Sequence, residues 1–303
     1  MSNKNVSTLK VAATYIGTIV GAGFASGQEI LQFFSVFGRN GLFGLIIVTI
    51  LFIAFGYIIM ELGQKLSSRS HLEIIRKTSG KYLGGLIDFL ITFFLFGALT
   101  AMIAGSGALV NQQFGISSLW GNVLMAGATV VTVLAGITGV INSISIVVPF
   151  LISSAVGISI FSIIFVPYDD TYVRAAVSGS SLIQNWLWAA LLYTSYNILL
   201  GISVLGPLGS NAKDKKAIRN GAILGGLGLG LGAIAIYLAL LNGIEGLANV
   251  EVPMILVASR ISYIIQIIYS IVLLAEIYTT AVGSLYGFTA RAAEYKRFNE
   301  KHI

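Results

Sequence analysis

A glycine-rich stretch near the start of the chain, Gly17-Thr-Ile-Val-Gly21-Ala-Gly23-Phe-Ala-Ser-Gly27-Gln-Glu29, decides how the sequence folds. It lies inside the apolar run 8–35, which exceeds the roughly 20 residues that a membrane-spanning helix needs. Each glycine inside a helix costs roughly 1 kcal/mol relative to alanine. Unwound backbone survives at membrane depth only where protein buries it or where it lines a cavity. We therefore expect the first helix to be broken at Gly21-Ala22-Gly23. The alternative is close packing of these small residues against a neighbouring helix.

The composition excludes water-soluble proteins. Of the 303 residues, 56% are hydrophobic and 10% are charged, whereas a soluble domain carries about 25% charged residues. Such a chain cannot cover a water-facing surface, so soluble enzymes and nucleic-acid-binding proteins are excluded. Cysteine is absent, and the two histidines, His71 and His302, lie in polar segments. We expect no disulfide framework, no zinc site and no Ser-His-Asp triad within the membrane, and we predict that the protein is not an enzyme.

Eight apolar stretches predict an all-α, polytopic membrane protein. They lack the period-two alternation of an outer-membrane barrel. The segment 243–257 is expected to be a loop or a short surface helix. The predicted spans are 8–35, 41–64, 82–110, 118–137, 141–166, 182–206, 217–241 and 258–289.

Basic residues are distributed unevenly between the two sides of these spans. Fifteen of the eighteen lie at the N-terminus, in the loops after the second, fourth and sixth spans, or in the C-terminal tail, which leaves Arg39, Arg174 and Arg260 on the other side. The positive-inside rule then predicts that both termini of this multi-pass protein face the cytoplasm, across the cell (cytoplasmic) membrane. The net charge of +6 is therefore a signal of topology, and no nucleic-acid partner is expected.

A second polar run, Tyr193-Thr-Ser-Tyr-Asn197, lies in the middle of the sixth span. We expect this helix to be broken too; the alternative is a polar stripe that faces neighbouring helices. Paired broken helices of opposite orientation are typical of transporters built from inverted repeats, with the substrate held at the breaks. We therefore expect a first repeat of five helices at 1–178 and an incomplete second repeat of three helices at 179–303. The predicted substrate-binding residues are Gly21, Ala22, Gly23, Thr194, Ser195, Tyr196 and Asn197.

The first-helix motif Gly17-Thr-Ile-Val-Gly-Ala-Gly-Phe resembles that of the amino acid–polyamine–organocation superfamily, the LeuT-fold transporters. The stretch from Val11 to Phe34 also resembles the YkvI-like bacterial membrane proteins. The resemblance implies substrate at the breaks of the first and sixth helices. For sodium-coupled members it implies a sodium site, which here would use backbone carbonyls of Gly17 and Val20 and the hydroxyls of Thr279 and Thr280. It further implies that Glu61 braces the break of the sixth helix; the alternative is a charge that reaches the membrane surface.

Acidic residues inside the membrane are functional candidates, because a charge there is costly. Glu276, Thr279 and Thr280 are spaced i, i+3 and i+4, so they share one helix face. Three oxygen donors suit a hard cation such as sodium, and the carboxylate could equally carry a proton; a third alternative is a protonated glutamate that bonds to a neighbour. Glu29 is expected to line an outer vestibule or to pair with Arg260, and otherwise to be an end-of-helix charge.

These features together predict a secondary active transporter, a symporter that moves a small polar solute by alternating access. An amino acid or a related metabolite is the expected solute, and coupling to sodium or to protons is left open. The alternative is a receptor or sensor on the same scaffold that does not transport. The other expected partner is the lipid bilayer, and a homo-oligomer is not excluded. No Lys or Arg lies near the middle of a span, so an anionic solute would be bound by backbone N–H groups at the start of the outer half of the first helix.

Overall fold

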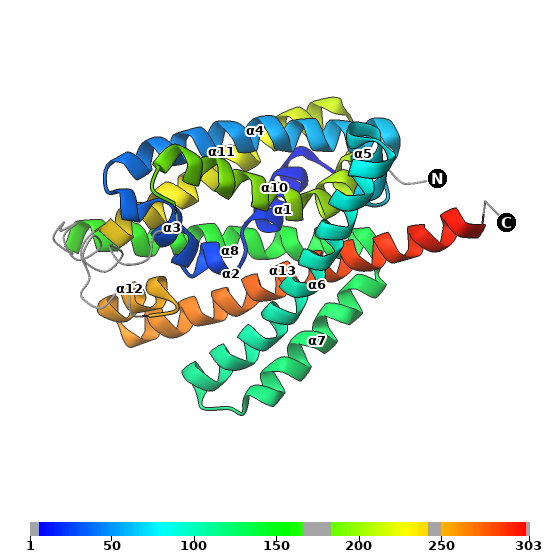
Figure 1. The fold of residues 1–303 in the computed structure, drawn as a ribbon. Helices are drawn as coiled ribbons and strands as arrows, with labels where there is room; N and C mark the ends of the chain where they lie inside the picture. The colour runs from blue at the N-terminus through cyan, green and yellow to red at the C-terminus, as the bar shows by residue number, and fades with distance from the viewer. Residues whose placement is uncertain (1–5, 166–182, 242–249, 301–303) are drawn as a thin grey trace.

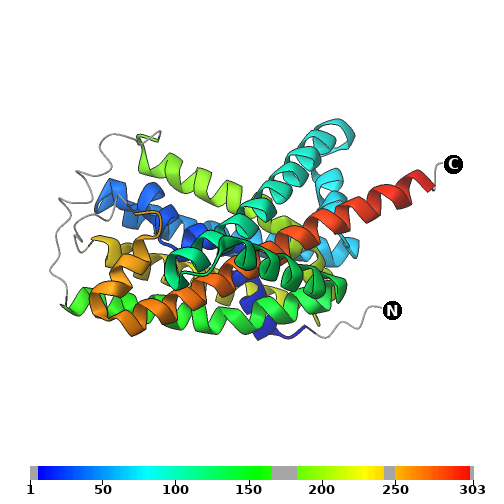
Figure 2. The same ribbon diagram turned by 90° about the horizontal axis from the view of Figure 1, so that it is seen from below.

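The computed structural model describes residues 6–165, 183–241 and 250–300 as a bundle of α-helices (Figures 1 and 2). Within these ranges no β-strand is present. The elements are α1 (Thr8–Ile19), α2 (Ala22–Ala25), α3 (Gln28–Phe33), the short 3-10 turn η1 (Ser35–Phe37), α4 (Asn40–Leu66), α5 (His71–Ser79), α6 (Lys81–Phe114), α7 (Ser118–Leu134), α8 (Gly136–Phe165), α10 (Trp186–Asn211), α11 (Lys215–Leu241), α12 (Pro253–Ile261) and α13 (Tyr263–Glu300).

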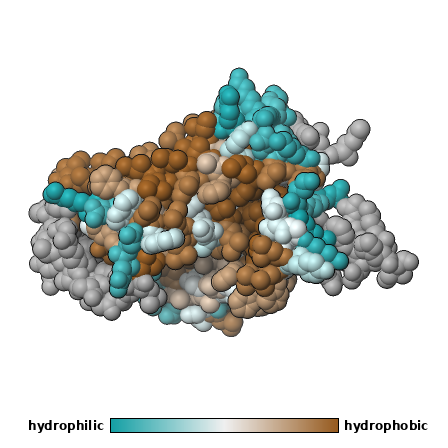
Figure 3. All heavy atoms as spheres, turned by 45° about the horizontal axis from the view of Figure 1, so that its top comes forward, coloured by the Kyte–Doolittle hydropathy of each residue, from teal (hydrophilic) through white to brown (hydrophobic). Residues whose placement is uncertain are grey.

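Six of the described helices are long and apolar enough to cross a membrane, namely α4, α6, α8, α10, α11 and α13. Helix α7 is apolar but has 17 residues, and the first expected span is divided into the short helices α1, α2 and α3. Apolar residues form a broad band over the visible face, and polar residues gather at its margins (Figure 3). The chain is therefore a multi-pass, all-α membrane protein, while the count of eight crossings stays a prediction.

The last expected span, 258–289, is not one helix. Ser262 is extended, with φ −167° and ψ 158°, and it separates α12 from α13. Its hydroxyl accepts a hydrogen bond from the N–H of Ile265 at 3.2 Å, which caps the start of α13. Pro253 begins α12, where the missing N–H of proline costs nothing. The expected surface helix is therefore α12, which begins and ends later than 243–257; residues 242–249 of that segment lie outside the described part of the chain.

The loop after the second span contains α5, which the hydropathy pattern did not predict. The hydroxyl of Ser70 caps this helix by accepting the N–H of Leu72 at 3.2 Å.

The boundary between the expected repeats, at 178 and 179, lies outside the described residues. The division into inverted repeats therefore stays a prediction.

Helices α4 and α10 lie in close contact along much of their length (Figure 1). A Cβ atom placed on Gly63 of α4 would overlap the backbone carbonyl of Gly206 in α10. Small residues permit this approach of two backbones.

The start of the chain is bound to the loop between α10 and α11. The N–H of Val6 donates to the carbonyl of Asn211 at 3.3 Å, and the N–H of Lys213 donates to the carbonyl of Val6 at 3.1 Å. Val6 and Ala212 thus form an isolated parallel bridge. Helix α1 then packs mainly against α11, α8 and α10, so the first helix lies inside the bundle.

Candidate functional site

The first helix is broken where the glycine cluster predicts. Helix α1 ends at Ile19, Val20 has φ −66° and ψ 117°, and Gly21 is extended with φ −114° and ψ −179°. A second break follows at Gly27, whose φ of 81° lies in the left-handed region that favours glycine. The expected break of the first helix is confirmed, but the unwound residues are Val20 and Gly21, because Ala22 and Gly23 already belong to α2.

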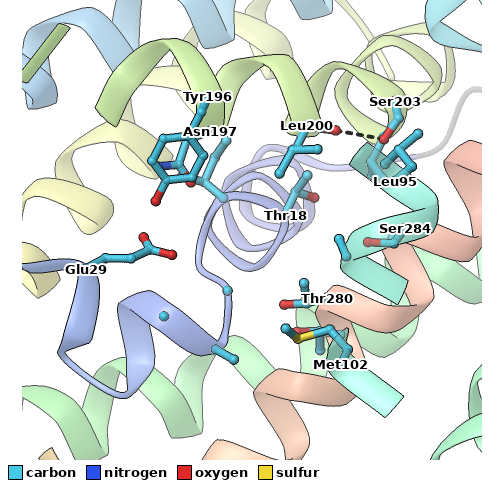
Figure 4. Close-up of a pocket in the computed structure, with 18 residues that line it drawn as sticks. Thr18, Glu29, Leu95, Met102, Tyr196, Asn197, Leu200, Ser203, Thr280 and Ser284 are labelled. Atoms are coloured by element: carbon cyan, nitrogen blue, oxygen red, sulfur yellow. Dashed lines mark hydrogen bonds between the residues drawn. The ribbon is translucent and has the colours of Figure 1, made fainter. Parts of the chain in front are cut away.

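A cavity of about 150 Å³ lies beside this break, between α1–α3, α6, α10 and α13 (Figure 4). A single water needs about 10–15 Å³ on such a measure, so the cavity can hold several waters or one small solute. Its polar lining comes from Thr18, Glu29, Tyr196, Asn197, Ser203, Thr279, Thr280 and Ser284. Gly21 at the break and Ala22 and Gly23 at the start of α2 also line it.

The expected break in the sixth helix is wrong. Helix α10 runs without interruption through Tyr193 and Asn197. The hydroxyl of Thr194 donates to the carbonyl of Ala190 at 2.9 Å, and the amide of Asn197 donates to the carbonyl of Tyr193 at 3.0 Å. These polar groups are satisfied by the preceding turn of their own helix, so the backbone has no need to unwind. The alternative of a polar stripe is the correct interpretation.

Four residues of this stripe are predicted to bind substrate, and two of them face the cavity. Tyr196 and Asn197 line the cavity. Thr194 is buried away from it. Ser195 is on the exposed face of α10, where its hydroxyl donates to the carbonyl of Leu191 at 2.7 Å. Thr194 and Ser195 therefore do not contribute side chains to the site.

The acidic face predicted in the last span is present on α13. Glu276 is fully buried, and the hydroxyl of Thr279 lies 3.2 Å from its Oε1 atom. Its Oε2 atom has no hydrogen-bond partner among the described residues. Thr279 and Thr280 line the cavity, and a Cβ atom placed on Gly21 would lie 3.7 Å from the hydroxyl of Thr280. The break in the first helix and the threonines of α13 thus face each other.

Gly17 and Val20, the other members of the expected ion site, do not line the cavity with side chains. Gly17 packs against α8, where an added Cβ atom would lie 2.5 Å from Ile144 and 2.6 Å from Val148. Close helix packing, the alternative for the glycine cluster, is therefore correct for this one glycine. The role of the backbone carbonyls of Gly17 and Val20 as ligands stays a prediction.

Glu29 points into the bundle. Its carboxylate lies against Gly23, so close that a Cβ atom there would collide with it. The hydroxyl of Tyr196 points toward the same carboxylate (Figure 4). The expected pair with Arg260 is not formed among the described residues, because Arg260 is exposed on α12 while Glu29 lines the cavity.

Glu61 does not brace the sixth helix. Its carboxylate lies 3.2 Å from the Lys65 ammonium and 2.8 Å from that of Lys215, so it links α4 to the start of α11. Since α10 is continuous, there is no break there to brace.

A buried charged cluster was missed by the sequence analysis. Asp88 of α6 lies 3.1 Å from Nε2 of His71 in α5, and Arg291 of α13 donates to both of its carboxylate oxygens. All three side chains are largely buried. The signal was an isolated aspartate inside a span, but its partner Arg291 lies 203 positions away and looked like part of a basic tail.

No protein-family model matches the chain. It is 29% identical over 311 residues to the membrane protein YkvI of Bacillus subtilis (strain 168), a match that covers 100% of this chain and 86% of that one. It is 30% identical over 276 residues to the protein YyaD of the same organism, covering 91% and 78%.

Among solved structures, a variant of the Eremococcus coleocola manganese transporter resembles the chain with a TM-score of 0.61 and 17% identity. The match covers 95% of this chain and 68% of the transporter. A second variant of that transporter gives a TM-score of 0.59 over the same shares. At this identity the likeness shows the fold, and it confirms the expected LeuT-like architecture.

Proposed function

We propose that this chain, which belongs to the family of the membrane protein YkvI and the protein YyaD, is a secondary transporter that moves a small polar solute by alternating access. The observation that carries this proposal is the broken first helix beside a cavity in the bundle whose apolar lining carries several polar groups. Discontinuous helices around such a site are typical of secondary transporters, in which one group of helices moves against the other.

The size and lining of the cavity favour a small organic solute such as an amino acid or a related metabolite. The manganese ion named for the structural neighbours is a poor fit, because the described residues contain no group of three or more His, Cys, Asp or Glu side chains that could hold a metal ion. The cavity instead offers hydroxyl, amide and carboxylate groups among apolar side chains, which is the usual composition of a small-molecule site.

The coupling ion is sodium or a proton, bound at Glu276, Thr279 and Thr280 and completed by backbone carbonyls of Gly17 and Val20. The unpaired oxygen of Glu276 and the position of Thr280 beside the break support this proposal. The protein lies in the cytoplasmic membrane with both termini in the cytoplasm, as the uneven distribution of basic residues supports.

The test is uptake of radiolabelled amino acids by proteoliposomes that contain the purified full chain. We expect accumulation that is stimulated by an inward gradient of sodium or of protons, and none in protein-free liposomes. Saturable binding without accumulation under either gradient would support the receptor or sensor instead.

A further inference from the structure

Buried polar atoms without a partner gather around the break of the first helix. Among the described residues they include Oε1 of Gln28, Oε2 of Glu29 and the hydroxyls of Tyr193 and Tyr196. Most buried polar atoms in proteins have a hydrogen-bond partner, and an unpaired one is unfavourable. Of these four residues, Glu29 and Tyr196 line the cavity, so their two unpaired atoms are the ones that a ligand in the cavity could satisfy.

The negative charge of the cavity lining indicates which kind of ligand it can bind. Glu29 lines the cavity, and no Lys, Arg or His is among its lining residues. The second buried carboxylate, Glu276, lies on α13 directly before the cavity-lining threonines. A buried carboxylate needs a cation or hydrogen-bond donors near it. A solute that carries only negative charge would be repelled by both carboxylates, which disfavours the purely anionic solute that the sequence left open.

Two tyrosines lie near the carboxylate of Glu29 and pack against a third aromatic ring. Tyr193 and Tyr196 pack edge to face with ring centroids 5.6 Å apart, and Phe33 lies 5.4 Å and 5.9 Å from them. Both tyrosines interact electrostatically with Glu29. Of these three rings, that of Tyr196 lines the cavity beside Glu29, and tyrosine attracts organic cations that approach its ring face.

We propose that the transported solute carries a primary ammonium group and that Glu29 binds this group, together with the hydroxyl of Tyr196. An ammonium has three N–H donors, and two acceptors for them line the cavity, the unpaired carboxylate oxygen of Glu29 and the hydroxyl of Tyr196. The inference rests on the proposed transport function and gives Glu29 a role in recognition of the solute.

The experiment uses matched pairs of compounds that differ only in the ammonium group. Thermal stabilisation of the purified full chain is measured with L-alanine and L-lactate, with L-serine and glycerate, and with ethanolamine and ethylene glycol. Sodium chloride alone is a further arm, because an inorganic cation could be attracted by the same carboxylate. We expect stabilisation by at least one amine of the set and by none of the three compounds without nitrogen.

Variants then test whether the stabilisation by the amine depends on Glu29. Glu29→Gln should weaken the apparent affinity for that amine by about tenfold or more, as expected for the loss of a hydrogen bond to a charged group. Tyr196→Phe removes only a hydroxyl and keeps the proposal testable if Glu29→Gln does not fold; it should cause a smaller loss. Glu251→Gln removes the same charge at an exposed position and should bind as the parent does.

Three outcomes would overturn the proposal. They are stabilisation by a compound without nitrogen, no stabilisation by any amine, and the same Glu29-dependent shift with sodium chloride alone. Transport is tested separately by the proteoliposome assay, so gradient-driven uptake of a solute without an amine would refute the ammonium site and leave the transporter intact. Glu29-dependent amine binding without uptake would refute the transporter and leave the ammonium site intact.

Discussion

Arg291 and Asp88 join α13 to α6 through two parallel hydrogen bonds, with Nε 2.6 Å from Oδ1 and Nη2 2.5 Å from Oδ2. The two side chains are 13% and 7% exposed. His71 of α5 contacts the same carboxylate. Three helices are thus held together by one aspartate at the end of the bundle where the basic loops lie.

Replacing this aspartate should destabilise the protein strongly. Asp88→Asn keeps the shape but removes the charge that pairs with Arg291, and the loss of one partner of a buried pair costs on the order of 3–5 kcal/mol. We expect a clear fall in the melting temperature of the purified protein, whereas the exposed Glu251→Gln should melt as the parent does. Asp88→Leu combined with Arg291→Met should recover part of the loss; an unchanged melting temperature of Asp88→Asn would show that the cluster does not hold the helices.

The contact between α4 and α10 gives a prediction about two glycines. Gly63→Ala places a methyl group against the backbone carbonyl of Gly206, which cannot move aside, so a loss of about 1–3 kcal/mol is expected. Gly97→Ala on α6 meets nothing within 4 Å and should be neutral or stabilising by up to about 1 kcal/mol, because alanine favours the helix. Thermal unfolding of the two variants in the same detergent checks this, and equal melting temperatures would argue against tight packing.

The broken first helix gives a second matched pair. Gly23→Ala and Gly23→Leu push a side chain into the carboxylate of Glu29, whereas a methyl group on Gly21 has its nearest neighbour at 3.7 Å. We expect both Gly23 variants to abolish binding of the stabilising amine, whereas Gly97→Ala on α6, which meets nothing within 4 Å, should retain it. Asn197→Ala should weaken binding less than Gly23→Leu, because its amide is engaged by its own helix. The readout is ligand-induced thermal stabilisation; full binding by Gly23→Leu would place the pocket elsewhere.

The ion site predicts a change in coupling. Glu276→Gln preserves the shape of the side chain but removes its negative charge, so uptake should lose its response to the gradient that drives the parent. Thr280→Val should weaken the same response, while Thr289→Val, at an exposed position of the same helix, should not. Uptake is compared with a sodium gradient, with a proton gradient and without a gradient. An unaltered response in both site variants would show that this face of α13 has a structural role and does not bind the coupling ion.

The orientation can be tested without background labelling, because the chain has no cysteine. A cysteine introduced at Asn111 should react with a membrane-impermeant maleimide from outside the cell. Cysteines at Arg76 or Lys213 should react only after the membrane is opened. All three positions are exposed, so labelling of all from one side would contradict the topology that the basic loops indicate.

The first break could be predicted from the sequence, since it depends on local chain properties. Gly21 and Gly23 weaken the helix wherever their neighbours lie. The continuity of α10 could not be predicted in this way. Whether Thr194 and Asn197 disrupt a helix depends on the rotamers with which they reach carbonyls one turn earlier, and a sequence does not specify these.

The direction of Glu29 and the Asp88 cluster required three-dimensional information. Glu29 turns inward because Gly27 adopts a left-handed conformation two residues earlier, which re-aims α3 relative to α2. Asp88 and Arg291 are separated by 203 positions, so only the packing of α6 against α13 reveals that they pair. Local signals therefore predicted which helix opens, while side-chain partners between helices could be identified only in the fold.

The bridge between Val6 and Ala212 has a consequence for how the protein is made. Helix α1 leaves the ribosome well before the partners that enclose it, α8, α10 and α11, and the loop that binds Val6 is about 200 residues behind. At roughly 5–20 residues per second this separation amounts to roughly 10–40 s of synthesis. During that interval the glycine-rich break is without its final neighbours, so this segment reaches its native surroundings long after it is made.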